Sequence, residues 1–160
     1  MGNYFLKKRL QKANLENTPK FNFANQTRYC KVIKIYDGDT ITIAMEIHKK
    51  IYKYSLRMLG YDSPEMKPPK NQPNREEEIK AAKEAKQALM DKIGNKIVKI
   101  RLEDFDKYGR LLGTVYLESG ILCFTSKENI NEYMVTNNYG YPYQGGTKKK
   151  FTNSESKINL

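Results

Sequence analysis

A strict alternation of apolar and polar side chains constrains the fold more than any other feature of this sequence. In residues 40–47, every second position is a large apolar residue: Ile41, Ile43, Met45 and Ile47. A period of two is typical of a strand with one face in a core. Strands are also predicted at residues 29–36 and 51–59, and the Asp37-Gly38 pair between the first two is a strong turn signal.

The predicted strand at residues 51–59 has two different faces. One face carries the large apolar residues Tyr52, Tyr54, Leu56 and Met58. Arg57 shares the opposite face with Lys53 and Ser55, so the period of two turns Arg57 away from the apolar side.

The second half of the chain predicts helices and further strands. Residues 75–93 form the clearest helix, because an acidic first turn precedes an apolar stripe and Gly94 follows. Strands are predicted at residues 96–102 and 111–117, and a second, shorter helix at residues 129–138. Elements in this order predict a β-rich α+β fold, a five-stranded Greek-key barrel of the OB type with two helices and basic, irregular termini.

Positive charge is concentrated at the two ends of the chain. The net charge is +11, of which residues 1–28 contribute +5 and residues 144–160 contribute +3. Residues 29–143 carry the remaining +3, which indicates a nearly balanced folded domain between a basic N-terminal arm and a basic flexible tail. A polyanionic partner such as nucleic acid would use such arms, although basic ends can also serve solubility alone.

The N-terminal arm has two parts. Residues 4–15 are compatible with a short basic helix, whereas residues 16–27 predict an extended segment in which Phe21 and Phe23 can attach the arm to the barrel. The sequence lacks the apolar run of a secretory leader or a transmembrane helix. We therefore expect an intracellular protein without integral membrane association, and a monomer by default.

Three acidic residues are placed for chemistry with a hard cation. Asp39 follows the predicted turn and Asp62 follows the third strand, so their carboxylates converge if the first and third strands are neighbours. Carboxylate oxygens, with the backbone carbonyl of Ser63, suit Ca²⁺ or Mg²⁺. Glu65 is placed to contact a water bound to that ion. Ordinary turn and surface roles are the alternative for each carboxylate taken alone.

Two arginines are candidates for holding a phosphate. Arg57 lies near Asp62 in the sequence, and Arg110 follows Gly109 at a predicted strand start, where glycine allows a ligand to approach closely. A guanidinium binds phosphate oxygens in a bidentate manner and stabilises charge that develops in a transition state. The alternative for Arg110 is a surface ion pair with Asp104 or Asp106.

Other residues are candidates for supporting roles. Asp37 and Thr40 are expected beside the cation ligands, with a plain turn role as the alternative for Asp37. The candidates for substrate contact are Lys107, Tyr108, Tyr141 and Tyr143. Tyrosines of the C-terminal segment can stack on bases, but they can equally pack that segment onto the barrel.

Three segments together resemble the staphylococcal nuclease family: Tyr36-Asp-Gly-Asp-Thr-Ile41, Leu56-Arg-Met-Leu-Gly-Tyr-Asp-Ser-Pro-Glu65 and Asp106-Lys-Tyr-Gly-Arg110. The resemblance covers about residues 29–143. It implies an OB-fold enzyme that uses one Ca²⁺ ion and cleaves DNA and/or RNA with little sugar specificity, leaving 3′-phosphate and 5′-hydroxyl ends. It also implies roles for matching residues: Asp39, Asp62 and the Ser63 carbonyl as Ca²⁺ ligands, Glu65 as general base, and Arg57 and Arg110 at the phosphate.

The chain departs from the family pattern after the second predicted helix. Residues 140–150, rich in Tyr, Gly and Lys, stand where the family has a long third helix. That form is similar to intracellular relatives from large DNA viruses, which implies action in a host cytoplasm. The alternative function is a noncatalytic nucleic-acid-binding OB module. Such modules can lose catalytic carboxylates or arginines, and the presence of the full set here favours the enzyme.

Overall fold

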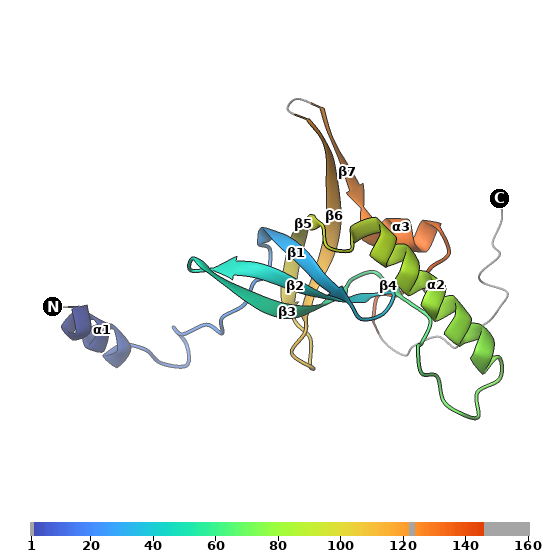
Figure 1. The fold of residues 1–160 in the computed structure, drawn as a ribbon. Helices are drawn as coiled ribbons and strands as arrows, with labels where there is room; N and C mark the ends of the chain where they lie inside the picture. The colour runs from blue at the N-terminus through green and yellow to red at the C-terminus, as the bar shows by residue number, and fades with distance from the viewer. Residues whose placement is uncertain (1, 122–123, 146–160) are drawn as a thin grey trace.

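The computed structural model describes residues 2–121 and 124–145 of the chain. Figure 1 shows the helices and strands in their arrangement. Their bounds are α1 (Gly2–Gln11), β1 (Thr27–Ile35), β2 (Thr40–Ile47), β3 (Lys50–Met58), β4 (Tyr61–Asp62), α2 (Arg75–Ile93), β5 (Ile97–Phe105), β6 (Leu111–Ile121), β7 (Phe124–Asn129), α3 (Ile130–Thr136) and β8 (Tyr141–Pro142).

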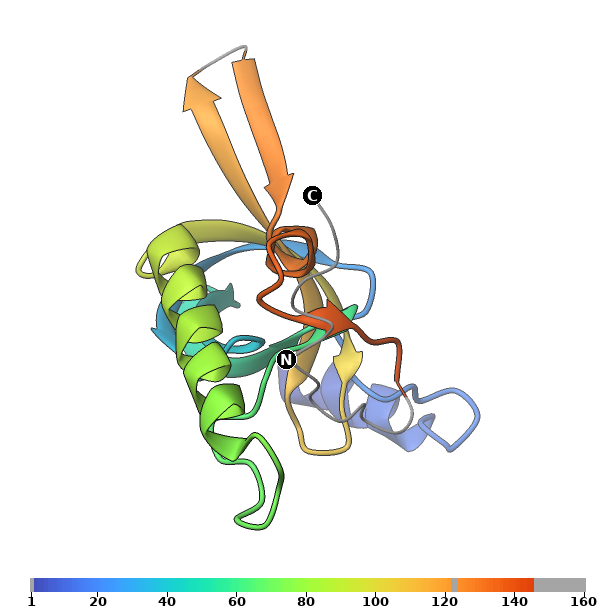
Figure 2. The same ribbon diagram turned by 90° about the vertical axis from the view of Figure 1, so that its right-hand side faces the viewer.

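Strands β1, β2, β3, β5 and β6 form a closed barrel. The strand order is β3-β2-β1-β5-β6-β7, and a short parallel pairing of β3 with β6 closes the circle. The other neighbours in the barrel are antiparallel. This mixed five-stranded barrel confirms the predicted OB-type α+β fold. Helix α2 runs along one side of the barrel (Figure 2).

The alternation of β2 builds the barrel core as predicted. Ile41, Ile43 and Met45 are at most 1% exposed. On β3 the core is shorter than its pattern indicates, because Leu56 and Met58 are buried but Tyr52 is 47% exposed. The β2–β3 hairpin extends past the barrel there, so the apolar face runs out into solvent (Figure 1).

The two predicted helices of the domain are α2 and α3. Helix α2 has the predicted bounds, and its buried residues are Glu78, Ala82, Ala85, Leu89 and Ile93. Helix α3 is shorter than predicted and ends at Thr136. Its start is fixed by the side chain of Asn129, which accepts the backbone N–H groups of Asn131 and Glu132. Among the described residues, no helix combines the length and apolar character needed to cross a membrane.

Several elements differ from the sequence-based prediction. The short basic helix anticipated at residues 4–15 of the N-terminal arm is present as α1, but it begins at Gly2 and ends at Gln11. Strand β7 continues β6 into a hairpin that projects from the barrel (Figure 2), and its polar Thr-Ser-Lys-Glu sequence gave no strand signal. Strands β4 and β8 form a separate two-stranded pair. The predicted irregular tail lies, from residue 146 onward, outside the described residues.

The arm contacts the barrel through its last part. Residues 2–22 are all exposed, and Phe23 is the first buried residue, at 2% exposure. Its ring lies 5.7 Å from that of Tyr54 and 5.9 Å from that of Phe105. Phe21 contacts Phe23 but stays 72% exposed. Phe23 therefore attaches the arm to the barrel.

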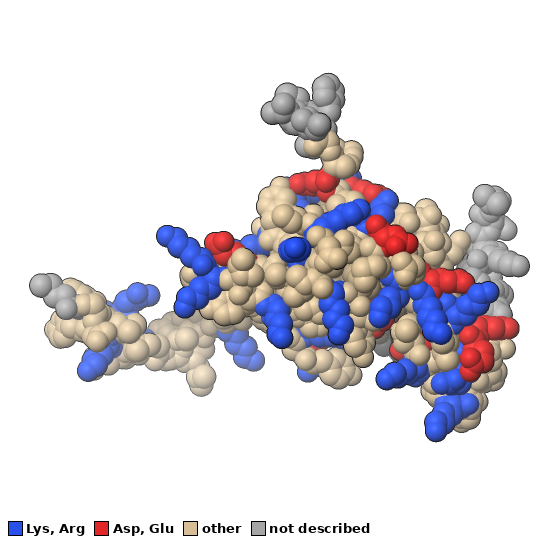
Figure 3. Space-filling view, in the orientation of Figure 1, with Lys and Arg blue, Asp and Glu red and all other residues tan. Residues whose placement is uncertain are grey.

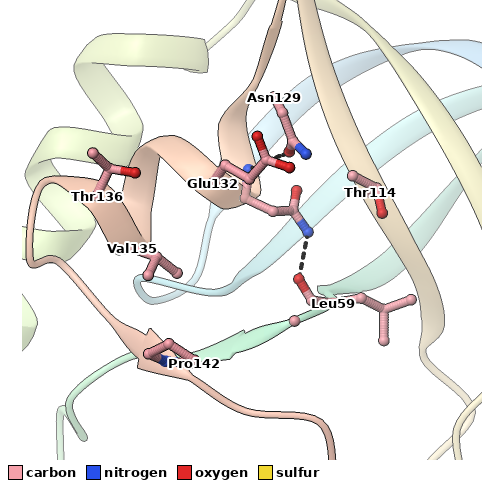
Figure 4. A pocket seen from close by; sticks show the side chains of 9 residues that line it. Leu59, Thr114, Asn129, Glu132, Val135, Thr136 and Pro142 are labelled. Carbon is pink, nitrogen blue, oxygen red and sulfur yellow. Dashed lines mark hydrogen bonds between the residues drawn. The ribbon is translucent and has the colours of Figure 1, made fainter.

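A buried amide links α3 to two barrel strands. Oδ1 of Asn131 accepts the backbone N–H of Val115 in β6 at 2.9 Å. Its Nδ2 donates to the carbonyl of Leu59, just after β3, at 2.7 Å (dashed line in Figure 4). The open cavity beside this bond has a volume of about 390 Å³ and includes Glu132 and Pro142. None of the predicted site residues lines it.

Candidate active site

The turn between β1 and β2 presents Asp39 toward the end of the barrel. Oδ1 of Asp37 accepts the backbone N–H groups of Asp39 at 3.2 Å and Thr40 at 2.7 Å, so Asp37 holds the turn. Burial and the nearby charge of Asp39 raise the pKa of Asp37 to about 6. The contacts of Asp37 are those of the turn role that was its alternative, and a role of Asp37 and Thr40 beside cation ligands stays a prediction.

Gly38 lets this turn pack tightly against the next segment. A Cβ atom at this position would lie 2.7 Å from Cβ of Ser63 and 2.9 Å from Cβ of Ala85 in α2. The Gly38 carbonyl also accepts the hydroxyl of the buried Tyr61 at 2.7 Å. Because Gly38 has no side chain, the β1–β2 turn can pack directly against Ser63, which follows β4, and against Ala85 in α2.

Asp39 and Asp62 are both buried at this junction, with 6% and 5% of their surface exposed. Oδ1 of Asp39 accepts the hydroxyl of Thr40 at 2.9 Å. Its Oδ2 accepts the backbone N–H of Ser63 at 2.9 Å and the Ser63 hydroxyl at 3.1 Å. These bonds fix the Asp39 carboxylate beside Ser63, the residue whose carbonyl is the third predicted ligand.

The guanidinium of Arg57 lies between the two carboxylates. Its Nη1 is 2.7 Å from Oδ2 of Asp39, and its Nη2 contacts Oδ1 of Asp62. Nη2 also donates to the carbonyl of Tyr61 at 3.0 Å. Arg57 reaches this place because it is paired with Thr40 across β2 and β3 and points away from the core. The position predicted for a cation between the acids is occupied by a basic side chain.

Arg110 is positioned by the turn before β6. Oδ1 of Asp106 accepts the backbone N–H groups of Tyr108 at 2.8 Å and Arg110 at 2.9 Å, and Oδ2 accepts Nε of Arg110 at 2.7 Å. Gly109 takes the left-handed backbone conformation that the turn needs, with φ of 78°. Burial alone would raise the pKa of Asp106, but the hydrogen bonds from Arg110 and Tyr108 outweigh it and lower that pKa. Arg110 therefore does form the ion pair with Asp106 that was considered as its alternative role, and this ion pair orients the Arg110 guanidinium.

Most predicted site residues line one cavity of about 380 Å³. The residues around it are Asp37, Asp39, Thr40, Arg57, Asp62, Ser63, Glu65, Tyr108, Arg110 and Tyr143. An adjoining cavity of about 450 Å³ shares both arginines and both of these tyrosines, and it adds Lys107. Tyr141 lines neither cavity but faces Asp62 across the β4–β8 pair. Burial, followed by the charge of Asp62, raises the pKa of Tyr141.

Glu78 is a residue of this region that the sequence patterns did not single out. It is 4% exposed in the first turn of α2. Its Oε1 accepts the backbone N–H of Glu65 at 3.0 Å, and its Oε2 accepts the side-chain amide of Gln72. Glu78 thus fixes the backbone of Glu65 and the loop that follows. The sequence signal that could have identified Glu78 is its position four residues before Ala82, which places it on the buried face of α2.

The proposed ligand atoms are of the type that a hard cation prefers. Asp39, Asp62 and the Ser63 carbonyl offer oxygen only, which Ca²⁺ and Mg²⁺ prefer over nitrogen or sulfur. Within the described residues there is no group of three or more His, Cys, Asp or Glu side chains that could hold a metal. An ion held by these two carboxylates would have to complete its shell with carbonyl oxygen and water. Arg57 faces the same carboxylates and would compete with such an ion.

Comparisons with known proteins relate the chain to one family and to several relatives. A family model of staphylococcal nuclease homologues matches residues 55–158. A protein of rice (Oryza sativa subsp. japonica), "Probable staphylococcal-like nuclease CAN2", is 32% identical over 97 residues, which are 61% of this chain and 21% of that protein. An "Uncharacterized endonuclease" of Haemophilus influenzae is 30% identical over 115 residues, 72% of this chain and 52% of that protein.

A third relative is similar over a comparable stretch. "Endonuclease YhcR" of Bacillus subtilis is 34% identical over 116 residues, which are 70% of this chain but 9% of that protein. The chain thus spans about half of the Haemophilus relative and smaller parts of the other two. Because the family model matches well over half of the sequence, and the closed five-stranded barrel is consistent with it, the chain belongs to the staphylococcal nuclease homologues.

Proposed function

We propose that this protein is a metal-dependent endonuclease that hydrolyses the phosphodiester bonds of DNA and RNA. The observation that carries the proposal is the single cavity that gathers Arg57, Arg110, Asp39, Asp62 and Glu65. Two arginines supply a site for a phosphate, and the carboxylates supply a site for a cation and a base. Relatives named nucleases or endonucleases support the same reaction class.

Asp39, Asp62 and the backbone carbonyl of Ser63 would hold one Ca²⁺ ion. A bound divalent cation supplies positive charge that neutralises phosphate oxygens and lowers the pKa of a coordinated water. The buried Asp39 carboxylate is already held by Thr40 and Ser63, so little of its geometry has to change on binding.

The remaining chemistry falls to side chains of the cavity. Glu65 accepts a proton from the attacking water as its oxygen forms a bond to phosphorus. The bond from phosphorus to the 5′-oxygen breaks, and that oxygen leaves with the bonding electrons and takes up a proton from solvent. The products are a 3′-phosphate and a 5′-hydroxyl. Arg57 and Arg110 stabilise the extra negative charge on the phosphoryl oxygens during this step.

Substrate contacts beyond the phosphate fall to the adjoining cavity. Lys107 and the 72%-exposed Tyr108 lie at its rim, and Tyr143 lines both cavities. A tyrosine face accepts any base by stacking, and a lysine accepts any phosphate, so neither group selects a sugar. Tyr141, beside Asp62, is the remaining candidate contact. These features favour cleavage of DNA and RNA alike.

A noncatalytic nucleic-acid-binding OB module is the second candidate. The ion pair between Arg110 and Asp106 and the contacts of Arg57 with two carboxylates are also what a binding module would need to keep its basic groups in place. The enzyme is favoured because Glu65 lies in the same cavity as both arginines. A module that only binds has no use for a carboxylate that repels the phosphate.

The deciding experiment is digestion of plasmid DNA and of a labelled RNA with Ca²⁺, with Mg²⁺ or with EDTA after metal removal. We expect cleavage with Ca²⁺, less with Mg²⁺ and none in EDTA, and end labelling should identify 3′-phosphates. The variant Glu65→Gln is the matched control, because it keeps the size of the side chain and removes the base. Binding of both polymers without cleavage under every metal would favour the module, whereas full activity in EDTA would remove the metal from the proposal.

A further inference from the structure

The cavity beside α3 takes no part in the chemistry proposed above. It has a volume of about 390 Å³, which is the size of a pocket for a small organic group. Leu59, Val135 and Pro142 give it an apolar lining, and a few polar side chains share it with them (Figure 4). We call it the α3 cavity. An apolar lining with few polar groups is typical of sites that hold a ring and fix its orientation.

The amide of Asn129 is oriented by the helix that it precedes. Its Oδ1 accepts the backbone N–H groups of Asn131 at 3.1 Å and Glu132 at 3.4 Å. Oδ1 therefore faces the backbone of α3, and Nδ2 is directed away from it. Asn129 lines the α3 cavity, and within the described residues its Nδ2 donates no hydrogen bond. The amide thus leaves one donor available to a ligand.

The carboxylate of Glu132 supplies acceptors at the same end of the cavity. Glu132 is exposed, and in the part of the chain that the structure describes its side chain forms no ion pair and accepts no hydrogen bond. Figure 4 shows Glu132 and Asn129 together where α3 begins, with Thr114 across from them on β6. Two parallel acceptors beside one donor are therefore available on one edge of the cavity.

This set of groups matches the Watson–Crick edge of guanine. That edge offers two donors, N1–H and the N2 amino group, beside the acceptor O6. A carboxylate can accept both donors at once, as it does with a guanidinium, and the Asn129 amide can donate to O6. Uracil and thymine offer one donor between two acceptors, so one of their oxygens would face the Glu132 carboxylate. The polar groups of the cavity therefore favour guanine over those bases.

The α3 cavity adjoins the cavities of the candidate active site. Leu59 and Gly60 line both the α3 cavity and the cavity of about 450 Å³ that contains Arg57 and Arg110. Apart from its two chain neighbours, no described residue comes within 4 Å of where a Cβ atom of Gly60 would lie, so the surface between the two cavities is open there. A strand whose phosphate is held by the two arginines can therefore place a neighbouring base in the α3 cavity.

Positive charge beside the α3 cavity suits the phosphates of such a strand. Arg101 in β5 is paired with Thr114, and Lys127 precedes Asn129 by two residues on the same face of β7. Both basic side chains are exposed. Figure 3 shows Lys and Arg spread over the face that it draws, as expected for a net charge of +11. A polyanion is therefore attracted to the protein although Glu132 itself is negative.

We propose that the α3 cavity holds a guanine base of single-stranded DNA or RNA, in a nucleotide that flanks the scissile phosphate. Glu132 accepts the N1–H and N2 amino groups, Asn129 donates to O6, and Leu59, Val135 and Pro142 contact the ring. The base has to be unpaired, because pairing in a duplex occupies the same edge. The proposal rests on the nuclease function above and adds a base preference to it.

The test measures binding of labelled single strands of about 10 nucleotides by fluorescence anisotropy, in EDTA and at one salt concentration. The strands are oligo(dT) and the same strand with one central deoxyguanosine or deoxyinosine. Wild type is compared with Glu132→Gln and with the matched variant Glu84→Gln. Both variants remove one negative charge from an exposed helical glutamate, and Glu84 lines none of the three cavities described above.

Wild type should bind the deoxyguanosine strand about fivefold or more tightly than oligo(dT), which is the lower end for a bidentate base contact. Deoxyinosine lacks the N2 amino group, so its strand should bind with intermediate affinity. Glu132→Gln should bind the three strands nearly equally, because a glutamine side chain offers one acceptor where guanine presents two donors. Glu84→Gln should keep the wild-type order.

Equal binding of the three strands by wild type would overturn the proposal and leave Glu132 to other ligands, such as a basic side chain of a protein partner. A guanine preference that survives Glu132→Gln, or that is as strong in a duplex, would overturn it too. Digestion of the same strands with Ca²⁺ tests the underlying function separately. A protein that cleaves but binds without preference would refute the base pocket alone, whereas one that prefers guanine in EDTA and never cleaves would refute the nuclease function alone.

Discussion

Nη1 of Arg57 lies 2.7 Å from Oδ2 of Asp39, so a basic side chain faces the carboxylate that is also the best candidate ligand for a cation. Its second contact, with Asp62, makes the guanidinium a bridge between the two acids. A divalent ion at the proposed site would therefore compete with Arg57 for the same oxygens. If an ion took them, the guanidinium would be free to bind a phosphate.

Arg57→Gln should strengthen Ca²⁺ binding while it removes most of the activity. Loss of a charged hydrogen-bonding competitor should improve Ca²⁺ affinity by about tenfold. Loss of one donor to the transition state should lower kcat by about 10²–10³. Calorimetry gives the first quantity without any turnover. An unchanged or weaker Ca²⁺ affinity would show that Arg57 does not compete with the ion.

Asp106→Asn should lower kcat by about tenfold or more, because Arg110 loses the carboxylate that orients its Nε. The amide oxygen of Asn can still accept the N–H groups of Tyr108 and Arg110, so the turn should stay folded. Asp104→Asn, two residues earlier near the end of β5, is the control. Steady-state kinetics together with the melting temperature separates the two effects, and normal turnover would mean that Arg110 is correctly placed without its partner.

Glu78→Ala should reduce kcat and leave Ca²⁺ affinity nearly unchanged. The buried carboxylate fixes the backbone of Glu65 and the side chain of Gln72, but it does not touch the proposed cation ligands in the described contacts. Its loss also leaves the N–H of Glu65 without its acceptor, at about 1–3 kcal/mol of stability. Glu78→Gln keeps one acceptor and should recover part of the activity. A parallel fall in Ca²⁺ affinity would contradict this positioning role.

A fragment of residues 16–147 should show a higher KM, a shallower salt dependence of binding and nearly the same kcat. It lacks α1, which has no buried residue, but keeps Phe23 on the barrel. The removed ends carry much of the net positive charge, and each lost phosphate contact reduces the salt slope by about 0.7–0.9. Kinetics at several salt concentrations checks this. Identical slopes would leave the ends without a role in binding, and a loss of kcat in a folded fragment would place an end in the active site.

Local periodicity was enough to place the elements that carry the site. The alternation of β2 and β3 predicted that Arg57 points away from the core, and the turn signal at Asp37 and Gly38 predicted the place of Asp39. Those inferences needed only neighbours along the chain. The OB topology followed from the order of the elements and the family resemblance together.

Contacts between distant segments could not be predicted in this way. The bridge from Arg57 to both acids depends on where β4 folds back, and the role of Glu78 depends on a loop that returns to the first turn of α2. A polar residue on an apolar stripe signals a buried partner but does not identify it. Strand β7 was missed because its pairing with β6, and not its own side chains, makes it a strand.

The seam that closes the barrel gives the candidate site an unusual dependence on complete folding. Strands β3 and β6 pair over only three positions, from Leu56 with Leu111 to Met58 with Gly113. Arg57 lies within this seam, and Arg110 directly precedes it. The two strands are far apart in sequence, so their contact pays a large loop-closure entropy and is expected to form late. Hydrolysis would then report on the fully closed chain, while a folding intermediate with an open seam would keep its two arginines apart and be inert toward nucleic acid.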